Sequence, residues 1–423
     1  MKTIFAALGA LALCSAPLAA RQRTPEQVAE AALRAAPVFD GHNDVPEALR
    51  GRYRNVIAGF DFDDSSRAPS ADDGPLGMHT DLPRLRKGRV GGQFWSVYVS
   101  AALPEPQAVV AVLEQIDVMK RLMARHRRDL AFVTTADQAA AAMKRGQIAS
   151  LLGMEGGNSI GESLAVLRQS YDLGARYLTL THSKTLTWAD SATDTPRHGG
   201  LTEFGRMVVR EMNRLGMLVD LSHVSEETMI DALDETGAPV IFSHSGVRAI
   251  DGHPRNVPDS VLARLPANGG VAMAVAYPAF VSEAYRQWSA DRAGETARLG
   301  SLYPGDPKAV TSGTAAWTAA HPRPVATVAQ WADHIDHVRR IAGVDHVGLG
   351  GDYDGMETGP RGAEDVTGYP VLFAELARRG WSQPELEKLA SRNILRVLRR
   401  AEAVAASQKG LAPLETPAVG TGR

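Results

Sequence analysis

Residues 218–245 read LVDLSHVSEETMIDALDETGAPVIFSHS, and this stretch decides the fold. Short apolar runs over 218–221 and 240–243 predict two buried strands, because parallel strands covered on both faces are apolar throughout. Between them, residues 226–235 place apolar side chains every three or four positions, which is the period of an amphipathic helix. The stretch therefore predicts one βαβ unit, and a Ser-His pair stands at the end of each of its strands, at 222–223 and 243–244.

The same alternation of strands and helices continues along the chain. We predict further strands at 37–40, 94–100, 148–154, 177–181, 271–276 and 346–350. We predict further helices at 107–125, 161–173, 202–215, 325–341 and 382–405. The strands total about eight, the number of a (β/α)8 TIM-like barrel. A doubly wound open sheet fits the alternation almost as well until the residues at the strand ends are considered.

The composition favours a soluble globular protein that acts on small molecules. Hydrophobic residues make up 44% and charged residues 22% of the chain, which excludes a disordered or fibrous protein. The formal net charge is -2, and there is no long basic stripe to hold nucleic acid or anionic lipid. We therefore expect no nucleic-acid partner.

The N-terminus has the pattern of a secretory signal peptide over residues 1–20. Lys2 precedes an apolar run that is too short to span a bilayer, and small residues follow the run. We expect secretion across the inner membrane into the periplasm, with no stable membrane span in the mature chain. The single cysteine, Cys14, lies within this segment, so no disulfide is expected. The bulky Leu13 argues against a lipid anchor on Cys14.

The remaining chain is predicted to form one domain with a tail. Residues 21–407 form the barrel domain, and 408–423 form a flexible C-terminal tail rich in Gly, Pro and Thr. Two long irregular insertions are expected, at 50–89 and 282–322. Insertions of this size usually supply an active-site wall, a lid or a subunit contact.

Ionisable side chains follow six of the predicted strands. They are, in chain order, His42 and Asp44, Glu155, His182, His223, His244 and Asp352. In a barrel, the carboxyl ends of the strands meet at one mouth. A lone histidine at a strand end is more often an ordinary polar residue than a ligand, but burying this whole set without a cation would be costly. Nitrogen and carboxylate ligands without a thiolate suit Zn2+, and tolerate Mn2+ or Co2+.

Five of these residues are predicted to bind metal. His42 and Asp44 are two positions apart on an extended strand and so point to the same side. Glu155 can give one oxygen to each of two ions, although a helix cap is its alternative role. His223 and His244 supply further nitrogen atoms. Because one ion with an open position does not use five protein ligands, we expect two Zn2+ ions with Glu155 as the bridge.

Two further residues are candidates for catalysis and binding. Asp352 could accept and return a proton as a general base and acid. A calcium loop is its alternative, but the spacing after residues 352–355 does not match one. Arg255 lies in a proline-rich loop, where its guanidinium could hold a substrate carboxylate or order the loop through a salt bridge.

The chain resembles the membrane (renal) dipeptidase family, as a secreted bacterial member. The motifs that carry the resemblance are DGHND at 40–44, MEGG at 154–157, LTH at 180–182, WAD at 188–190, DLSH at 220–223, SHS at 243–245, RNVPD at 255–259 and GDYDG at 351–355. They occur in the family's order across nearly the whole mature chain. Asn158 and Val275 depart from residues that are common in the family.

The resemblance implies a zinc-dependent dipeptidase. It would cleave L-Xaa-L-Xaa and L-Xaa-D-Xaa dipeptides through a hydroxide that bridges the two metals. The metal ligands would be His42, Asp44, Glu155, His223 and His244, with Glu155 as the bridge. In the same resemblance, His182 contacts the scissile carbonyl, Arg255 the terminal carboxylate, and Asp352 transfers the proton. A homodimer is also implied.

Two other classes of protein remain as alternatives. One is a different amidohydrolase, such as a lactonase, a deaminase or an N-acyl amino acid hydrolase. Many of these bridge their metals with a carboxylated lysine, whereas Glu155 stands at that place here, and Lys184 is the only lysine close by. The other is a metal- or peptide-binding protein without turnover, which would have no need of a proton carrier such as Asp352.

Overall fold

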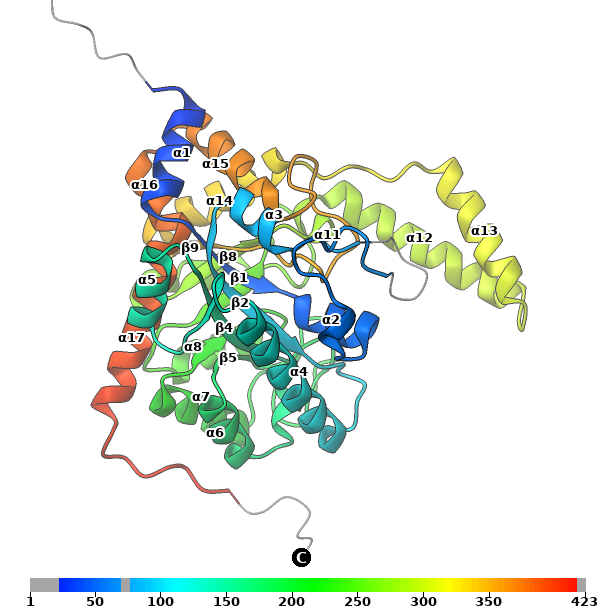
Figure 1. Ribbon diagram of the computed structural model, residues 1–423. Helices are drawn as coiled ribbons and strands as arrows, with labels where there is room; N and C mark the ends of the chain where they lie inside the picture. Colours follow the sequence, from blue (N-terminus) through cyan, green and yellow to red (C-terminus); the bar gives the residue numbers. More distant parts are fainter. Residues whose placement is uncertain (1–22, 70–76, 417–423) are drawn as a thin grey trace, which may run out of the picture.

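Eight parallel strands close into a barrel in the computed structural model, which describes residues 23–69 and 77–416 (Figure 1). The barrel strands are β1 Val38–Asn43, β2 Val90–Tyr98, β4 Ile148–Glu155, β5 Ala175–Thr179, β6 Leu218–Asp220, β7 Ile241–Ser245, β8 Val271–Val275 and β9 Val347–Gly350. Pairing of β9 with β1 and of β2 with β4 completes the circle. The predicted TIM-like barrel is confirmed, and the alternative prediction of a doubly wound open sheet is wrong.

A further strand, β3 (Leu130–Phe132), pairs with the first half of β4 outside the circle. This strand could not be predicted from the sequence, because three residues are too few to show a period. Each predicted barrel strand overlaps an observed one, with the ends displaced by a few residues. Such displacements are expected, because hydrogen bonding between strands decides where a strand ends.

The helices pack around the barrel and fill the connections between strands. Their bounds are α1 Pro25–Ala35, α2 Val45–Tyr53, α3 Leu82–Lys87, α4 Glu105–Arg125, α5 Ala136–Lys144, α6 Leu164–Asp172, α7 Glu203–Leu215, α8 Glu226–Glu235, α9 Asp259–Leu262, α10 Leu265–Asn268, α11 Pro278–Val281, α12 Glu283–Leu302, α13 Pro307–Ala320, α14 Val328–Ala342, α15 Tyr369–Arg378, α16 Gln383–Glu387 and α17 Asn393–Ser407. The helix predicted at 382–405 is divided into α16 and α17 by a π-helical turn at Lys388–Arg392. Helix α8 illustrates how the sequence sets a boundary, because the Ser225 side chain accepts a hydrogen bond from the Thr228 amide.

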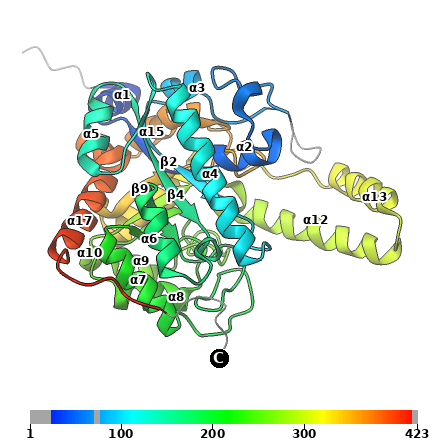
Figure 2. The same cartoon turned by 60° about the horizontal axis from the view of Figure 1, so that its bottom comes forward.

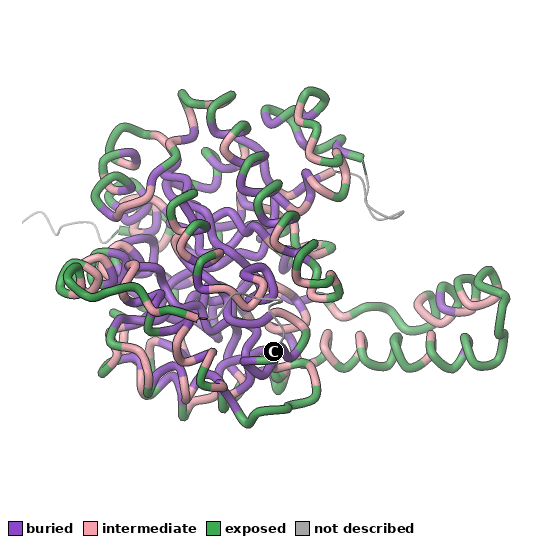
Figure 3. Tube along the Cα trace, turned by 90° about the horizontal axis from the view of Figure 1, so that it is seen from below, coloured by how far each residue is buried: buried purple, intermediate pink, exposed green. Residues whose placement is uncertain are grey.

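The insertion predicted to be irregular at 282–322 is instead helical, so that prediction was wrong. Helices α12 and α13 lie side by side and project from one side of the barrel (Figure 2). Most of this arm is exposed (Figure 3). A helix that buries almost nothing shows no clear apolar stripe, which is why its period was not recognised. The other insertion, 50–89, holds the end of α2 and the short helix α3.

An apolar layer inside the barrel supports the polar ends of the strands. Phe94 on β2 contacts Phe39 on β1 and Tyr177 on β5, with ring centroids 5.6 and 4.9 Å apart. Because β2 and β5 are not neighbours in the sheet, the contact between Phe94 and Tyr177 crosses the barrel interior. The Tyr177 hydroxyl then lies 2.9 Å from Nδ1 of His42, which joins the apolar layer to the candidate site.

The chain ends extend beyond the described residues. The predicted signal peptide, with Cys14, lies outside them. Within the predicted tail, the Leu414 amide donates to Glu211 Oε2 at 3.2 Å, and Arg168 donates to the Leu414 carbonyl at 3.0 Å. The flexibility of the tail stays a prediction. Among the described residues, no helix is both long and apolar enough to cross a membrane.

Candidate metal centre

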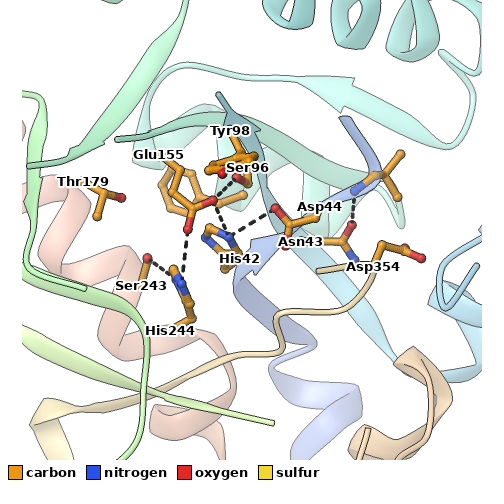
Figure 4. Close-up of polar contacts among 12 residues, drawn as sticks. His42, Asn43, Asp44, Ser96, Tyr98, Glu155, Thr179, Ser243, His244 and Asp354 are labelled. Carbon is orange, nitrogen blue, oxygen red and sulfur yellow. Dashed lines mark hydrogen bonds and ion pairs between the residues drawn. The ribbon is translucent and has the colours of Figure 1, made fainter. Parts of the chain in front are cut away.

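The structure brings all five predicted metal ligands together at the mouth of the barrel. Figure 4 labels four of them, His42, Asp44, Glu155 and His244. His42 lies on β1, Asp44 directly precedes α2, and Glu155 is the last residue of β4. His223 follows β6, and His244 lies on β7. All five are buried, so their polar atoms face one another rather than water.

Glu155 lies at the centre of the cluster, and its two carboxylate oxygens face different histidines. Oε1 is 3.0 Å from His223 Nε2 and 3.4 Å from His244 Nε2. Oε2 is 3.3 Å from His42 Nε2 and accepts a hydrogen bond from the Ser96 hydroxyl at 2.9 Å. A carboxylate in this position can offer one oxygen to a metal ion on each of its two sides.

One predicted ligand atom at the mouth lacks the partner that a buried polar atom normally has. His42 Nε2 is buried and has no hydrogen-bond partner among the described residues. His223 Nε2 and His244 Nε2 point at each other at 3.0 Å. These three ring nitrogens surround the Glu155 carboxylate, and divalent cations would satisfy this group of buried atoms together.

The ligand atoms form three overlapping groups. Within each group, one atom from every member lies within 4.8 Å of the others. The groups are His42, Glu155 and His244; Glu155, His182 and His223; and His42, Asp44 and Asp352. The geometry thus adds His182 and Asp352 to the set of candidate ligands, beyond the substrate and proton-transfer roles predicted for them.

The hydrogen bonds around His244 set the protonation of its ring. Ser243 Oγ donates its only hydrogen to Asp220 Oδ2 at 2.6 Å and lies 2.8 Å from His244 Nδ1. The ring must therefore donate from Nδ1 to Ser243, which leaves a lone pair on Nε2. Such a donation from a histidine's other nitrogen is usual for metal-ligating histidines. Asp220, which was not predicted as a site residue, is thus a positioning residue.

Asp220 accepts four hydrogen bonds at the strand ends. Burial raises the pKa of this carboxyl, but four hydrogen bonds oppose the shift. Oδ1 accepts from the backbone amides of Ser222 and Ser243, and Oδ2 accepts from the Thr179 and Ser243 hydroxyls. These partners come from β5, β7 and the segment after β6, so Asp220 ties neighbouring strand ends together.

A second buried carboxyl, Asp40, also links neighbouring strand ends at the mouth through the hydrogen bonds that it accepts. Its Oδ1 accepts from the His42 and Gly351 amides at 3.1 and 2.7 Å. Its Oδ2 accepts from the Tyr369 hydroxyl at 2.7 Å. Asp40 therefore joins the ends of β1 and β9, which carry His42 and Asp352.

Three non-glycine residues at the mouth have left-handed backbone conformations. They are His223, Asp352 and Asp354, with φ of 70°, 60° and 69°. Such conformations cost energy in a residue with a side chain and gather at functional sites. Gly355 is required for space and not for its backbone conformation, because a Cβ there would lie 2.4 Å from Asp44 Oδ2 and 2.8 Å from Asp352 Oδ1. Only glycine leaves room for these two carboxylates.

Asp352 and His182 line the opening above the cluster. Burial, followed by the negative charge of Asp44, raises the pKa of Asp352 well above its usual range. A cation beside the carboxyl would lower it again, because positive charge favours the ionised form. The His182 ring packs on Tyr98 and His223, with centroids 4.5 and 4.1 Å away.

Arg255 is a buried cation beside the cluster. It is 2% exposed, and its guanidinium donates to the His244 carbonyl at 3.1 Å and to Ser245 Oγ at 3.3 Å. Burial lowers the pKa of Arg255 to about 10, so it remains charged near neutral pH. It makes no ion pair in the described part of the chain, and its Nε has no hydrogen-bond partner there. The salt-bridge role that the sequence left open is therefore not observed.

The cavity at the mouth has a volume of about 250 Å3. Four of its lining residues were not singled out from the sequence: Glu47, Tyr98, Tyr277 and Phe280. Glu47 had a signal, because it follows Asp44 by three positions and so shares a helix face with it. The others are aromatic. Tyr98 and Tyr277 lie at or just after strand ends, where only imidazoles and carboxylates were expected to act, and Phe280 lies on α11.

Comparison with known proteins identifies the family. The family model for membrane dipeptidase (peptidase family M19) matches residues 26–411. The chain belongs to this family. Membership makes it a metallodipeptidase and confirms the resemblance found in the sequence motifs. The alternatives of a lactonase, a deaminase or a binding protein without turnover are accordingly not supported.

Curated relatives agree with the family model. The chain is 39% identical over 392 residues to Dipeptidase 3 of Macaca fascicularis, an alignment that covers 92% of this chain and 70% of that protein. It is 39% identical over 390 residues to Dipeptidase 3 of Rattus norvegicus, covering 91% and 69%.

Solved structures share the fold. A metallopeptidase from Rhodobacter sphaeroides, liganded with a phosphinate mimic of the dipeptide L-Ala-D-Ala, superposes with a TM-score of 0.68. The two are 26% identical, and the match covers 86% of this chain and 99% of that one. The probable dipeptidase PvdM from Pseudomonas aeruginosa gives a TM-score of 0.75 at 22% identity, covering 90% and 99%, which supports the fold alone.

Proposed function

We propose that this dipeptidase uses two Zn2+ ions at the barrel mouth to hydrolyse L-Xaa-L-Xaa and L-Xaa-D-Xaa dipeptides. His42 and Asp44 would hold one ion, His223 and His244 the other, and Glu155 would bridge them. The observation that carries this proposal is the division of the Glu155 oxygens, with Oε1 3.0 Å from His223 and Oε2 3.3 Å from His42. The grouping of Asp352 with His42 and Asp44 supports it as a further ligand of the first ion.

The remaining chemistry is assigned to side chains around the cavity. When bound, the metal ions supply Lewis acidity, which polarises a carbonyl and makes the attacking water acidic near neutral pH. His182 would donate a ring N–H to the carbonyl oxygen of the scissile bond as negative charge develops there. Asp352 would take up the proton released by water and return it to the departing amine.

Arg255 is proposed to bind the C-terminal carboxylate of the substrate. A buried guanidinium without an anionic partner is unfavourable, so a substrate carboxylate would compensate its charge. The cavity of about 250 Å3 is near the lower limit of small-ligand sites. Both features favour short substrates that have a free terminal carboxylate.

Acceptance of a D-residue at the C-terminal position has separate support. The Rhodobacter sphaeroides relative is described with a mimic of L-Ala-D-Ala in its structure. We extend that stereochemistry to this chain as part of the proposal. Hydrolysis rates for L-Ala-L-Ala and L-Ala-D-Ala, measured side by side, test it directly.

Export to the periplasm rests on residues 1–20. Mature protein from the periplasmic fraction should begin near Arg21 when its N-terminus is sequenced. Full-length protein confined to the cytoplasm would contradict export. The proposed homodimer is tested by measuring the mass of the mature protein in solution.

The central experiment measures dipeptide hydrolysis and metal content on the same sample. About two zinc ions per chain together with cleavage would support the proposal. Two zinc ions without cleavage of any dipeptide would contradict the proposed substrates. Folded, unchelated protein that holds no metal would contradict the whole site.

A further inference from the structure

A second cavity lies at the base of the α12–α13 arm and has a volume of about 360 Å3. Helix α12 contributes Tyr285, Trp288 and Arg292 to its wall. The opposite wall contains Glu357, from the loop that follows Asp352. The arm therefore meets the active-site loop across this cavity, and the mechanism proposed above leaves the cavity without a role.

Tyr277 connects the two cavities because it lines both of them. Its ring stacks on Phe280, with centroids 4.6 Å apart and an angle of 23° between the rings. Phe280 in turn faces the guanidinium of Arg255, which lies 5.3 Å from the ring centroid. A C-terminal residue whose carboxylate is bound at Arg255 would therefore sit beside Phe280 and Tyr277. Because Tyr277 lines both cavities, a side chain placed beside it has a path into the second cavity.

The charges around the second cavity leave one cation unmatched. Arg323 pairs with Glu357 at 2.7 Å. Arg292 lies over the Trp288 ring at 5.9 Å and belongs to no ion pair within the described residues. An anionic group entering the cavity would meet this guanidinium.

Tyr277 adds a hydrogen-bond donor to the same cavity. Burial and the nearby negative charges raise its pKa to about 12, so the hydroxyl stays protonated at neutral pH. A protonated phenol can donate to a carboxylate. A guanidinium, a phenol and the aromatic wall of Trp288 together suit an acidic side chain on a long apolar stem.

We propose that the second cavity is the subsite for the C-terminal side chain of the dipeptide, and that Arg292 makes it select glutamate over uncharged residues of the same size. The inference rests on the proposed function, because it uses Arg255 to orient the substrate. It assigns the arm an active-site role: α12 forms one wall of the specificity pocket.

The test compares L-Ala-L-Glu with L-Ala-L-Gln, which differ in charge but hardly in shape. kcat/KM is measured for both substrates in the unsubstituted metal-loaded protein, in Arg292→Gln and in Arg298→Gln. Arg298 is the matched control, because it lies on the same helix but pairs with Glu295 at 2.6 Å. The preference for Ala-Glu over Ala-Gln should fall about three- to fivefold in Arg292→Gln, the scale of a partly exposed ion pair. The change should appear in KM, and Arg298→Gln should keep the full preference.

The outcomes separate the subsite from the function on which it rests. Cleavage of L-Ala-L-Ala with the same Glu-to-Gln preference in Arg292→Gln and the unsubstituted protein would overturn the subsite alone. A loss confined to Glu-Ala against Gln-Ala would overturn the assignment to the C-terminal residue. Failure to cleave even L-Ala-L-Ala would overturn the proposed function, and the subsite with it.

Discussion

The barrel mouth and the α12–α13 arm hold their residues in opposite ways. At the mouth, side chains from several strands are buried and tied together, as Asp220 and Asp40 show through their bonds to neighbouring strand ends. On the arm, Leu299 is the buried residue of α12 and Thr314 that of α13. Many contacts fix a side chain to the accuracy that catalysis needs, whereas a surface arm can vary and so alter substrate choice.

The largest effect is expected from Glu155→Gln at the mouth. An amide has one oxygen and one N–H2 group, so it cannot offer an oxygen to a metal ion on each side. We expect loss of about one metal ion or more per chain and a fall in kcat/KM of about a thousandfold. Metal analysis and dipeptide hydrolysis on one sample measure both.

Glu47→Gln is the matched control for that change. Glu47 is a carboxyl of the same cavity but belongs to none of the three ligand groups. Its metal content should equal that of the unsubstituted protein. If Glu155→Gln also kept its full metal content, Glu155 would not be the bridge.

A smaller loss is expected from Arg255→Met. The substitution would leave the terminal carboxylate of a bound substrate without its proposed partner. It should therefore lower kcat/KM about a hundredfold while the metal content stays the same. The variant should also lose the distinction between L-Ala-L-Ala and its C-terminal amide, because Arg255 is assigned to the carboxylate. Arg248→Met, in the same loop but paired with Glu226 at 2.7 Å, provides the control. A retained preference for the free carboxylate would disprove the assignment.

Asp220→Asn should weaken metal binding without touching a ligand. Two backbone amides require an oxygen at Oδ1, so the new N–H2 group must face the Ser243 hydroxyl. Ser243 is then free to donate to His244 Nδ1, which moves the ring proton to Nε2 and blocks that ligand. We expect metal affinity to fall about 10- to 100-fold in a competition titration. Thr179→Val removes a donor to Asp220 Oδ2 but leaves the Ser243 hydrogen bond in place. An equal loss of metal affinity in that variant would refute the proposed shift of the His244 ring proton.

The smallest effect on activity is expected from substitutions that test how stable the barrel and the arm are. Leu349→Ala in the barrel should lower the free energy of unfolding by about 2–5 kcal/mol, because the side chain is fully buried. Leu299→Ala should lower it by less than about 1 kcal/mol, since the arm can open locally while the barrel stays folded. Hydrogen exchange should quicken in α12 and α13 only. Equal losses in denaturant unfolding would mean that the arm is part of the cooperative core.

The sequence predicted the barrel and the gathering of its strand-end residues. His223 and His244 could be placed because short apolar runs reveal parallel strands, and parallel strands bring their ends together. The α12–α13 arm could not be predicted, because helices that bury little lack an apolar stripe. Tyr277, just after β8, and Phe280, on the short helix α11, were missed because aromatic residues that follow an apolar run look like ordinary core.

What the sequence determined by itself was the kind and order of the groups at the mouth, since residue type and strand period are local properties. The tertiary structure alone decided which oxygen of Glu155 faces which histidine, and that Arg255 is buried without an ion pair. It also decided the protonation of His244 and the sharing of Tyr277 between two cavities. These features depend on distances between residues far apart in the chain, and a local pattern carries no record of such distances.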